Sequence, residues 1–201
     1  MCEVIIELYR SLDHFLICRK GGLIVQQHNE IRDAIGDLAA LLWGQVKREP
    51  AVSKDGDDGT LVANLVVHGV WSPQSEALFD MCITDTGAQS YLGYAPASIL
   101  FQAEDEKKQK YVAAANACRA HFTPLCFSVD GLTGSEAACF IKRLATGLSL
   151  KCERNYSEVL CWICTRLAFA ILRATGLCVR GTHSKWRCLG LEDGAAISDL
   201  T

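Results

Sequence analysis

Residues Glu76–Asp85, EALFDMCITD, decide the fold that we expect for this chain. Read with the two-residue period of a strand, Phe79 and Met81 point to one face, and Asp80 points to the other. A carboxylate in mid-strand costs several kcal/mol when it is buried without a partner. We therefore expect Asp80 to meet a cation, a network of hydrogen-bond donors or a water-filled cleft.

A second apolar run lies upstream, Leu61–Val67 (LVANLVV), and it also carries one polar residue, Asn64. Two neighbouring strands that each present one oxygen-bearing side chain are an arrangement by which metal-dependent nucleases hold Mg²⁺. Asn64 and Asp80 are therefore the first candidate pair for a functional site. The alternative for Asp80 alone is a buried acid whose charge is satisfied inside the fold.

Composition sets the wider limits. With 201 residues, half of them apolar and a fifth charged, the sequence predicts one globular domain. A net charge of −3 argues against a general nucleic-acid coat but leaves room for a local basic groove. Eleven cysteines without a secretory leader indicate reduced thiols and an intracellular location. We expect no membrane span, because the most apolar run, 159–179, contains Arg166 and Arg173.

Hydrophobic periodicity predicts the order helix, strand, strand, strand, helix, strand, helix, helix. The first helix is expected to begin at a cap, Asn29, and the first strand to end near Pro50. The expected elements are helix 29–43, strands 45–52, 61–68 and 76–85, helix 96–118, strand 122–129, and helices 134–151 and 156–179. This α/β order is the core layout of the restriction-endonuclease-like fold, a mixed sheet flanked by helices, here with a C-terminal helical extension.

Nearly the whole chain resembles one family with this fold. It is similar to the restriction-like endonuclease domain at the C-terminal end of reverse-transcriptase polyproteins from non-LTR retrotransposons that insert at fixed sites. The matching pieces run in one order across about residues 13–187: DHFLICRKGG (13–22), HNEIRD (28–33), REP (48–50), ANL (63–65), GVW (69–71), LFD (78–80), EKKQKY (106–111), FTPLCFS (122–128), GSEAACFIKRLA (134–145) and YSEVLCWICTRLAFAILRATGLCVRG (156–181).

The resemblance implies a set of catalytic residues. The first metal-binding aspartate of the family falls on Asn64, the second on Asp80, and the basic residue two positions later on Cys82. The helix motif in which lysines precede a tyrosine falls on Lys107, Lys110 and Tyr111, and these lysines are expected to supply positive charge from the helix. An intact site of this kind binds Mg²⁺ or Mn²⁺.

Further residues are assigned by the same resemblance. Glu30 lies where the first helix can add an acid to the metal site. The expected DNA contacts are His28, Lys107, Lys108, Lys110, Arg166 and Arg173. The competing interpretations are a solvated helix face for the lysines at 107–110, and solvation or pairing with Glu153 and Glu158 for the arginines.

The departures from the family pattern predict an impaired enzyme. Asn64 removes one negative charge, Cys82 cannot orient water as a lysine does, and the family arginine before His28 is Gln27. Residues 1–27 are interpreted as a leader with half of a zinc knuckle, 28–187 as the endonuclease-like domain and 188–201 as a disordered tail. Because the upstream thiol pair of the knuckle is missing, no zinc site is expected around His14 and Cys18.

Two functions follow from this reading. The first is a metal-dependent DNA endonuclease that nicks a target strand for target-primed reverse transcription, impaired in this chain. Its partners would be DNA and the polymerase part of the parent polyprotein, in the nucleus. The second is a non-catalytic remnant that at most binds DNA or a partner through the same groove.

Overall fold

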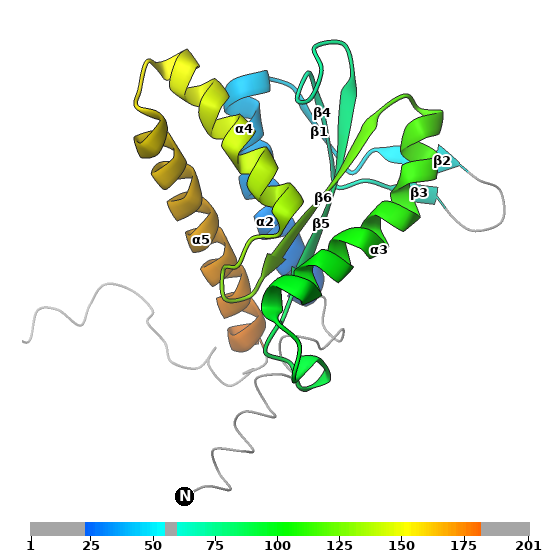
Figure 1. The fold of residues 1–201 in the computed structure, drawn as a ribbon, viewed down its shortest axis with the longest axis vertical. Helices are drawn as coiled ribbons and strands as arrows, with labels where there is room; N and C mark the ends of the chain where they lie inside the picture. The colour runs from blue at the N-terminus through cyan, green and yellow to red at the C-terminus, as the bar shows by residue number, and fades with distance from the viewer. Residues whose placement is uncertain (1–22, 55–59, 182–201) are drawn as a thin grey trace, which may run out of the picture.

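The computed structural model describes residues 23–54 and 60–181 (Figure 1). The elements along the chain are α2 (Leu23–Trp43), β1 (Val46–Arg48), β2 (Ala51–Lys54), β3 (Thr60–Val62), β4 (Leu65–His68), β5 (Glu76–Thr84), the 3-10 helix η1 (Gln89–Tyr91), α3 (Pro96–Ala117), β6 (His121–Ser128), α4 (Ser135–Cys152) and α5 (Tyr156–Gly181). The fold is mixed α/β, as the sequence predicts.

Four strands form one mixed sheet in the order β1-β4-β5-β6. β4 pairs antiparallel with both β1 and β5, whereas β6 runs parallel to β5. A parallel pair needs a crossover connection, and α3 supplies it between β5 and β6. Pro124 lies in β6 at the edge of the sheet, where a residue without a backbone N–H is tolerated. The expected mixed sheet is therefore confirmed.

Two of the expected strands, 45–52 and 61–68, are not continuous. Each is broken in two, and the pieces nearest to each other, β2 and β3, form a separate antiparallel pair. Figure 1 shows this pair projecting from the side of the main sheet. The expectation of two unbroken strands in one sheet was wrong.

The backbone around Glu49 and Asn64 explains the break. Glu49 has a φ of 51°, outside the strand region, and Pro50 follows it. The Glu49 N–H donates to the Asn64 carbonyl at 3.0 Å, and the Ala63 N–H donates to the Pro50 carbonyl at 3.1 Å. The two bends are thus hydrogen-bonded to each other, so the two chain segments turn away from the main sheet side by side and continue as β2 and β3.

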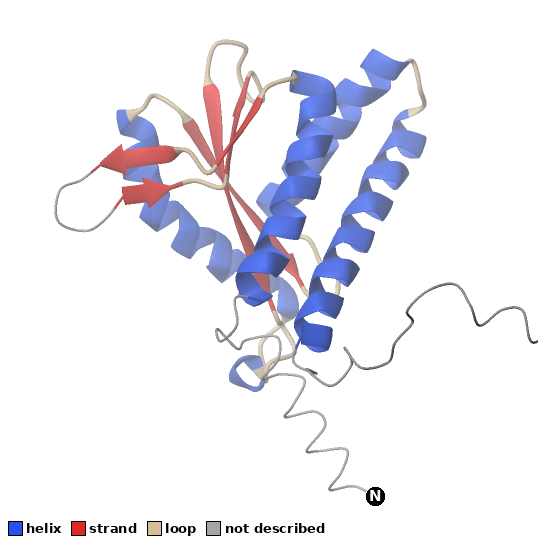
Figure 2. Cartoon of the chain, turned by 180° about the vertical axis from the view of Figure 1, so that it is seen from behind, coloured by secondary structure: helices blue, strands red, loops and turns tan. Residues whose placement is uncertain are grey.

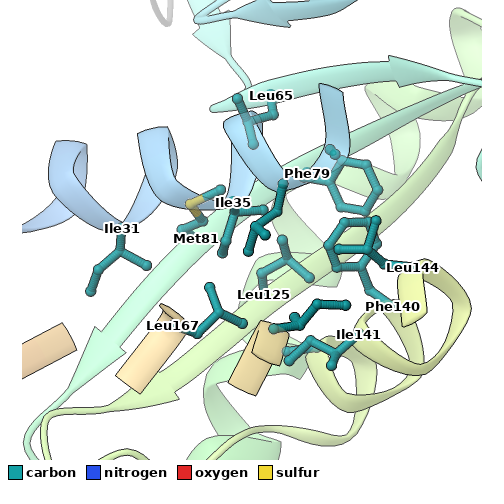
Figure 3. Packing of buried hydrophobic residues seen from close by; sticks show 14 of the residues in the cluster. Ile31, Ile35, Leu65, Phe79, Met81, Leu125, Phe140, Ile141, Leu144 and Leu167 are labelled. Carbon is teal, nitrogen blue, oxygen red and sulfur yellow. The ribbon is translucent and has the colours of Figure 1, made fainter. Parts of the chain in front are cut away.

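Helices cover both faces of the sheet. Figures 1 and 2 show α2, α4 and α5 on one face and α3 alone on the other. The main core lies on the three-helix side, where Phe79 and Met81 of β5 meet Leu125 of β6 and Phe140 of α4 (Figure 3). The rings of Phe79 and Phe140 are tilted, with centroids 4.9 Å apart. Burial of each such side chain contributes about 1.5–3 kcal/mol.

A smaller apolar cluster lies under α3. It consists of Ala63, Val66, Leu78, Ala115 and Ala120. The alternation of β5 explains why there are two clusters, because odd-numbered positions of β5 face the main core and even-numbered positions face α3. Asp80 is one of the even-numbered positions, so it faces α3 directly beyond the small cluster.

Helix α2 begins at Leu23, earlier than the sequence suggests. Asn29 therefore lies inside the helix and is not its N-cap, and the expected domain boundary at 27/28 falls within one helix. Ile31 and Ile35 are buried, as expected for the inner face. His14, Cys18 and the expected tail at 188–201 lie outside the described residues.

Helix α5 packs against α2 and α4 but remains largely exposed on its outer side. Phe169 is 62% exposed and Leu172 is 64% exposed. By length and composition alone, Tyr156–Cys178 passes as a segment that could cross a membrane, and it is the one described helix that does so. The expectation of no membrane span rests on Arg166 and Arg173 within this segment.

Candidate active site

Asn64 and Asp80 face each other across neighbouring strands. The pairing of Leu65 with Phe79 places Asn64 opposite Asp80, and residues directly opposite in an antiparallel pair share a face. Asn64 lies at the bend, where its N–H donates to the Phe79 carbonyl at 2.9 Å. Neither residue is helical, and the two lie together as the sequence predicts.

The Asn64 side chain has a structural task at this point. Its Oδ1 accepts a hydrogen bond from the Met81 N–H at 2.5 Å. β4 pairs with β5 only as far as Phe79. The hydrogen bond of the Asn64 side chain therefore links the two segments beyond their last backbone pair. The amide oxygen that would face a metal ion is thus already engaged by the backbone of β5.

Asp80 forms an ion pair with Lys107 of α3. The Lys107 Nζ lies 2.6 Å from Asp80 Oδ2, and the side chains are 26% and 5% exposed. Burial alone would lower the pKa of Lys107, but the charge of Asp80 and its hydrogen bond together raise it above the ordinary value. Asp80 therefore meets the cation that its position demands, and the cation comes from α3.

Tyr111 lies one helical turn after Lys107 and faces the same site. Its hydroxyl donates to the Val62 carbonyl at 2.9 Å, and its ring stacks on Phe122 with centroids 4.8 Å apart. Burial raises the pKa of Tyr111, and the nearby Asp80 carboxylate raises it further. Tyr111 is thus held as a neutral hydroxyl beside Asp80. Lys110 is exposed, with its Nζ 5.2 Å from the centroid of the Tyr111 ring.

His28 enters the site from α2. Burial lowers the pKa of His28, while Asp80 opposes this effect and Lys107 and Arg32 add to it. The Asn64 side chain also opposes the lowering of the His28 pKa. Four elements therefore contribute to one polar cluster: α2, the bend before β4, β5 and α3.

Arg32, which the sequence interpretation missed, lies one turn after His28 on the same side of α2. Its guanidinium bonds to Asp33 at 3.0 Å and also to Glu49 at the bend. The hydrogen bond that Arg32 donates to Asp33 raises the pKa of Arg32, and Glu49 raises it further. The sequence signal that could have identified Arg32 is its spacing of four residues from His28, which places both side chains on one side of a helix.

Cys82 lies two residues beyond Asp80 on the same strand face. Its Sγ is 3.5 Å from the Thr84 hydroxyl, and a hydrogen bond from Cys126 of β6 lowers the pKa of Cys82. It carries no positive charge, so Lys107 is the cation nearest to Asp80 among the expected catalytic residues.

Other expected site residues lie elsewhere. Glu30 contacts Arg173 of α5, with 3.7 Å between Oε2 and Nη2, and it does not join Asp80. The reason is helical phase, because Glu30 lies about 200° around α2 from His28. The Arg166 guanidinium carbon lies 5.2 Å from the centroid of the Trp162 ring. Both arginines belong to α5, on the opposite face of the sheet from α3 (Figure 1).

Lys108 is paired with a residue of α4 and not left free for phosphate. Its Nζ lies 2.5 Å from Glu136 Oε1, and this bond is the largest cause that raises the pKa of Lys108. Of the expected DNA contacts on α3, Lys110 remains the exposed one without a carboxylate in the described part of the chain.

Comparison with known proteins does not assign the chain to a family. A scan against models of known protein families found no match, and a search of curated proteins found none.

The residues present do not fit a complete Mg²⁺ site. Asp80 is one carboxylate, and one of its oxygens is bonded to Lys107. Asn64 brings a neutral oxygen that is bonded to Met81 N–H. In the described ranges, no three His, Cys, Asp or Glu side chains gather as a metal-binding group. Mg²⁺ prefers carboxylates, and a second one is missing where Asn64 stands.

Proposed function

We propose that this chain is a DNA endonuclease domain with the restriction-endonuclease-like fold, of the type that ends the polyproteins of site-specific non-LTR retrotransposons, and that its nicking activity is strongly reduced. The order of elements supports the proposal. A helix precedes three antiparallel strands of the main sheet, β1, β4 and β5, and a crossover helix then leads to the parallel fourth strand, β6. Its working partners would be DNA and the polymerase part of a polyprotein, in the nucleus.

One observation carries the proposal: Asn64, Asp80 and Lys107 meet from three separate elements. Random placement of polar residues would not bring a bend, the middle of a strand and a helix to one point. Tyr111 and His28 lie at the same point. In an intact site of this type, a divalent metal supplies a Lewis acid and an activated water.

Reduced activity follows from this chain's own residues. Position 64 lacks the carboxylate, and the one remaining acid is buried and neutralised by Lys107. A cation that binds Asp80 Oδ2 must first displace the Lys107 ammonium from it. Lys110 is the exposed cation beside Tyr111, and it is suited to contact a DNA phosphate.

The burial of Asp80 also favours the second candidate function, a domain that binds DNA without cutting it. With only 5% of its side chain exposed, Asp80 resembles a structural ion-pair partner as much as a metal ligand. In that case DNA binding depends on Lys110 and no nicking depends on Asp80.

The test is to measure DNA binding and plasmid nicking side by side. Mobility shifts at low salt are expected to show binding that weakens in Lys110→Ala. Nicking of supercoiled plasmid in Mg²⁺ and in Mn²⁺ is expected to exceed that of Asp80→Ala by a small factor. Binding with identical traces for the native chain and Asp80→Ala selects the second function. Absence of any DNA binding would rule out both.

A further inference from the structure

Two cysteines lie side by side next to the candidate active site. β5 and β6 run parallel in register, and Cys82 is directly paired with Cys126. Residues paired in this way have side chains on the same face of the sheet. Here that face lies under α3. Both thiols are free in this structure.

The in-register pairing places the two thiols next to each other on neighbouring strands. The Cys82 Sγ also lies 3.5 Å from Thr84 Oγ1. Cys126 is fully buried, whereas Cys82 is partly exposed. A small oxidant can therefore reach Cys82 first, with Cys126 already next to it.

The surroundings favour oxidation at Cys82. Lys107, whose ammonium is bonded to Asp80 two residues before Cys82, brings positive charge to the same face of β5. The exposed cysteines on α4 and α5, Cys139, Cys152, Cys161 and Cys164, have no thiol paired with them across a strand. Cys82 and Cys126 thus differ from these four cysteines because they are paired with each other on neighbouring strands.

We propose that Cys82 and Cys126 form a redox-sensitive site at which an oxidant of the hydrogen peroxide class converts the two thiols into a disulfide. The Cys82 sulfur attacks one peroxide oxygen, which gives a sulfenic acid and one water. The Cys126 sulfur then attacks the Cys82 sulfur, and the departing hydroxide takes the Cys126 proton as a second water. Two electrons pass from the thiols to the peroxide, and no further reactant is needed.

The disulfide is expected to be reducible. Neighbouring strands lie about 4.8 Å apart, whereas the Cβ atoms of a disulfide average about 3.8 Å. Closing the bond therefore requires β5 and β6 to approach locally, and strained disulfides are the labile ones. This inference concerns two thiols alone, so it holds whether or not the chain cleaves DNA.

The test is peptide mapping by mass spectrometry after the full chain is treated with hydrogen peroxide and quenched by alkylation. The expected product is a Cys82–Cys126 cross-linked peptide that has lost two hydrogens and is restored by dithiothreitol. Because the tryptic peptide with Cys126 also carries Cys139, the mapping is repeated in Cys139→Ser, where the cross-link is expected to persist.

Variants at the pair separate the two steps. In Cys126→Ser, Cys82 is expected to stop at the sulfenic acid, which dimedone traps, and in Cys82→Ser, Cys126 is expected to stay reduced. If Cys126→Ser fails to fold, Cys82→Ser and the native map still decide the matter. The proposal is overturned if both thiols stay reduced while the exposed cysteines oxidise, or if Cys82 oxidises and Cys126 remains a free thiol in the native chain.

Discussion

Lys107 Nζ lies 2.6 Å from Asp80 Oδ2, and this ion pair fastens α3 to the middle of β5. Lys107→Met would leave a buried carboxylate without its cation, so we expect the free energy of unfolding to fall by about 3 kcal/mol. Lys110→Met is the matched control on the same helix, and we expect it to cost less than about 1 kcal/mol. Urea unfolding of both variants measures the difference. Equal stability of the two variants would show that the pair is not structurally important.

Glu104 ties α3 to α4 in a similar way. It is 1% exposed, and its carboxylate accepts hydrogen bonds from Ser135 Oγ at 2.6 Å and Glu136 N–H at 3.0 Å, at the N-terminus of α4. We expect Glu104→Ala to destabilise the fold by about 2–3 kcal/mol, because two donors at the N-terminus of α4 lose their buried, charged acceptor. Glu106→Ala, on the exposed side of α3, is expected to have little effect. The urea midpoint of each variant tests this, and a Glu104→Ala midpoint equal to that of Glu106→Ala would contradict it.

Gly134 gives an independent test of the same contact. A Cβ at this position would collide with the Glu104 carboxylate and would lie 3.1 Å from the Cys126 carbonyl oxygen. Gly134→Ala is therefore expected to lower Tm. Gly176 lies within α5 with nothing within 4 Å of its would-be Cβ, so Gly176→Ala is expected to stabilise by about 0.5–1 kcal/mol. A thermal scan in which both variants change Tm in the same direction would contradict the packing described here.

His28 should make stability depend on pH. The pKa of His28 is lowered in the folded state, chiefly by burial. Below about pH 6.5, His28 therefore binds a proton more readily in the unfolded chain than in the folded one. The free energy of unfolding should therefore fall as pH drops through this range. Asp80, Lys107 and Arg32 are the charges that face the ring. In His28→Gln this part of the pH dependence should vanish, whereas in His121→Gln, at an exposed position, it should remain. Profiles of the native chain and His28→Gln that coincide between pH 5 and 7.5 would refute this role.

Much of the fold was predictable from sequence periodicity. β5 and α3 lie within a residue or so of their expected bounds, because apolar spacing reports burial directly. The bend at Glu49 was not predictable, because a positive φ at a non-glycine residue leaves no mark in the pattern. Asn64 was singled out correctly as a polar interruption, but its bond to the Met81 N–H depends on where β4 stops.

The candidate site was predictable only in part. The meeting of Lys107 with Asp80 follows from the helix motif, which the resemblance supplied. The separation of Glu30 from the site depends on how α2 is rotated against the sheet, and one sequence does not fix that rotation. Glu104 was not singled out, because it stands in the charged run EDEKKQ, a pattern typical of a solvated helix face, although it is buried. Burial of a charged residue is decided by the element opposite it, here the start of α4.

We propose that the polar cluster around Asp80 is a nuclease site disabled mainly by the amide at position 64. Asn64→Asp returns the missing carboxylate and keeps an oxygen to accept the Met81 N–H, and Lys107 already provides the cation beside Asp80. Cys82→Lys, which adds a second cation on the same strand face, is tested separately and together with Asn64→Asp.

The decisive measurement is the rate of supercoiled-plasmid nicking in Mg²⁺ for the native chain, Asn64→Asp and Asn64→Asp with Asp80→Ala. The account predicts at least about a tenfold gain in Asn64→Asp, about 1.4 kcal/mol of barrier, together with tighter Mg²⁺ binding by calorimetry. The second substitution should abolish both gains. Native nicking as fast as that of Asn64→Asp, or a gain that survives Asp80→Ala, would contradict the account.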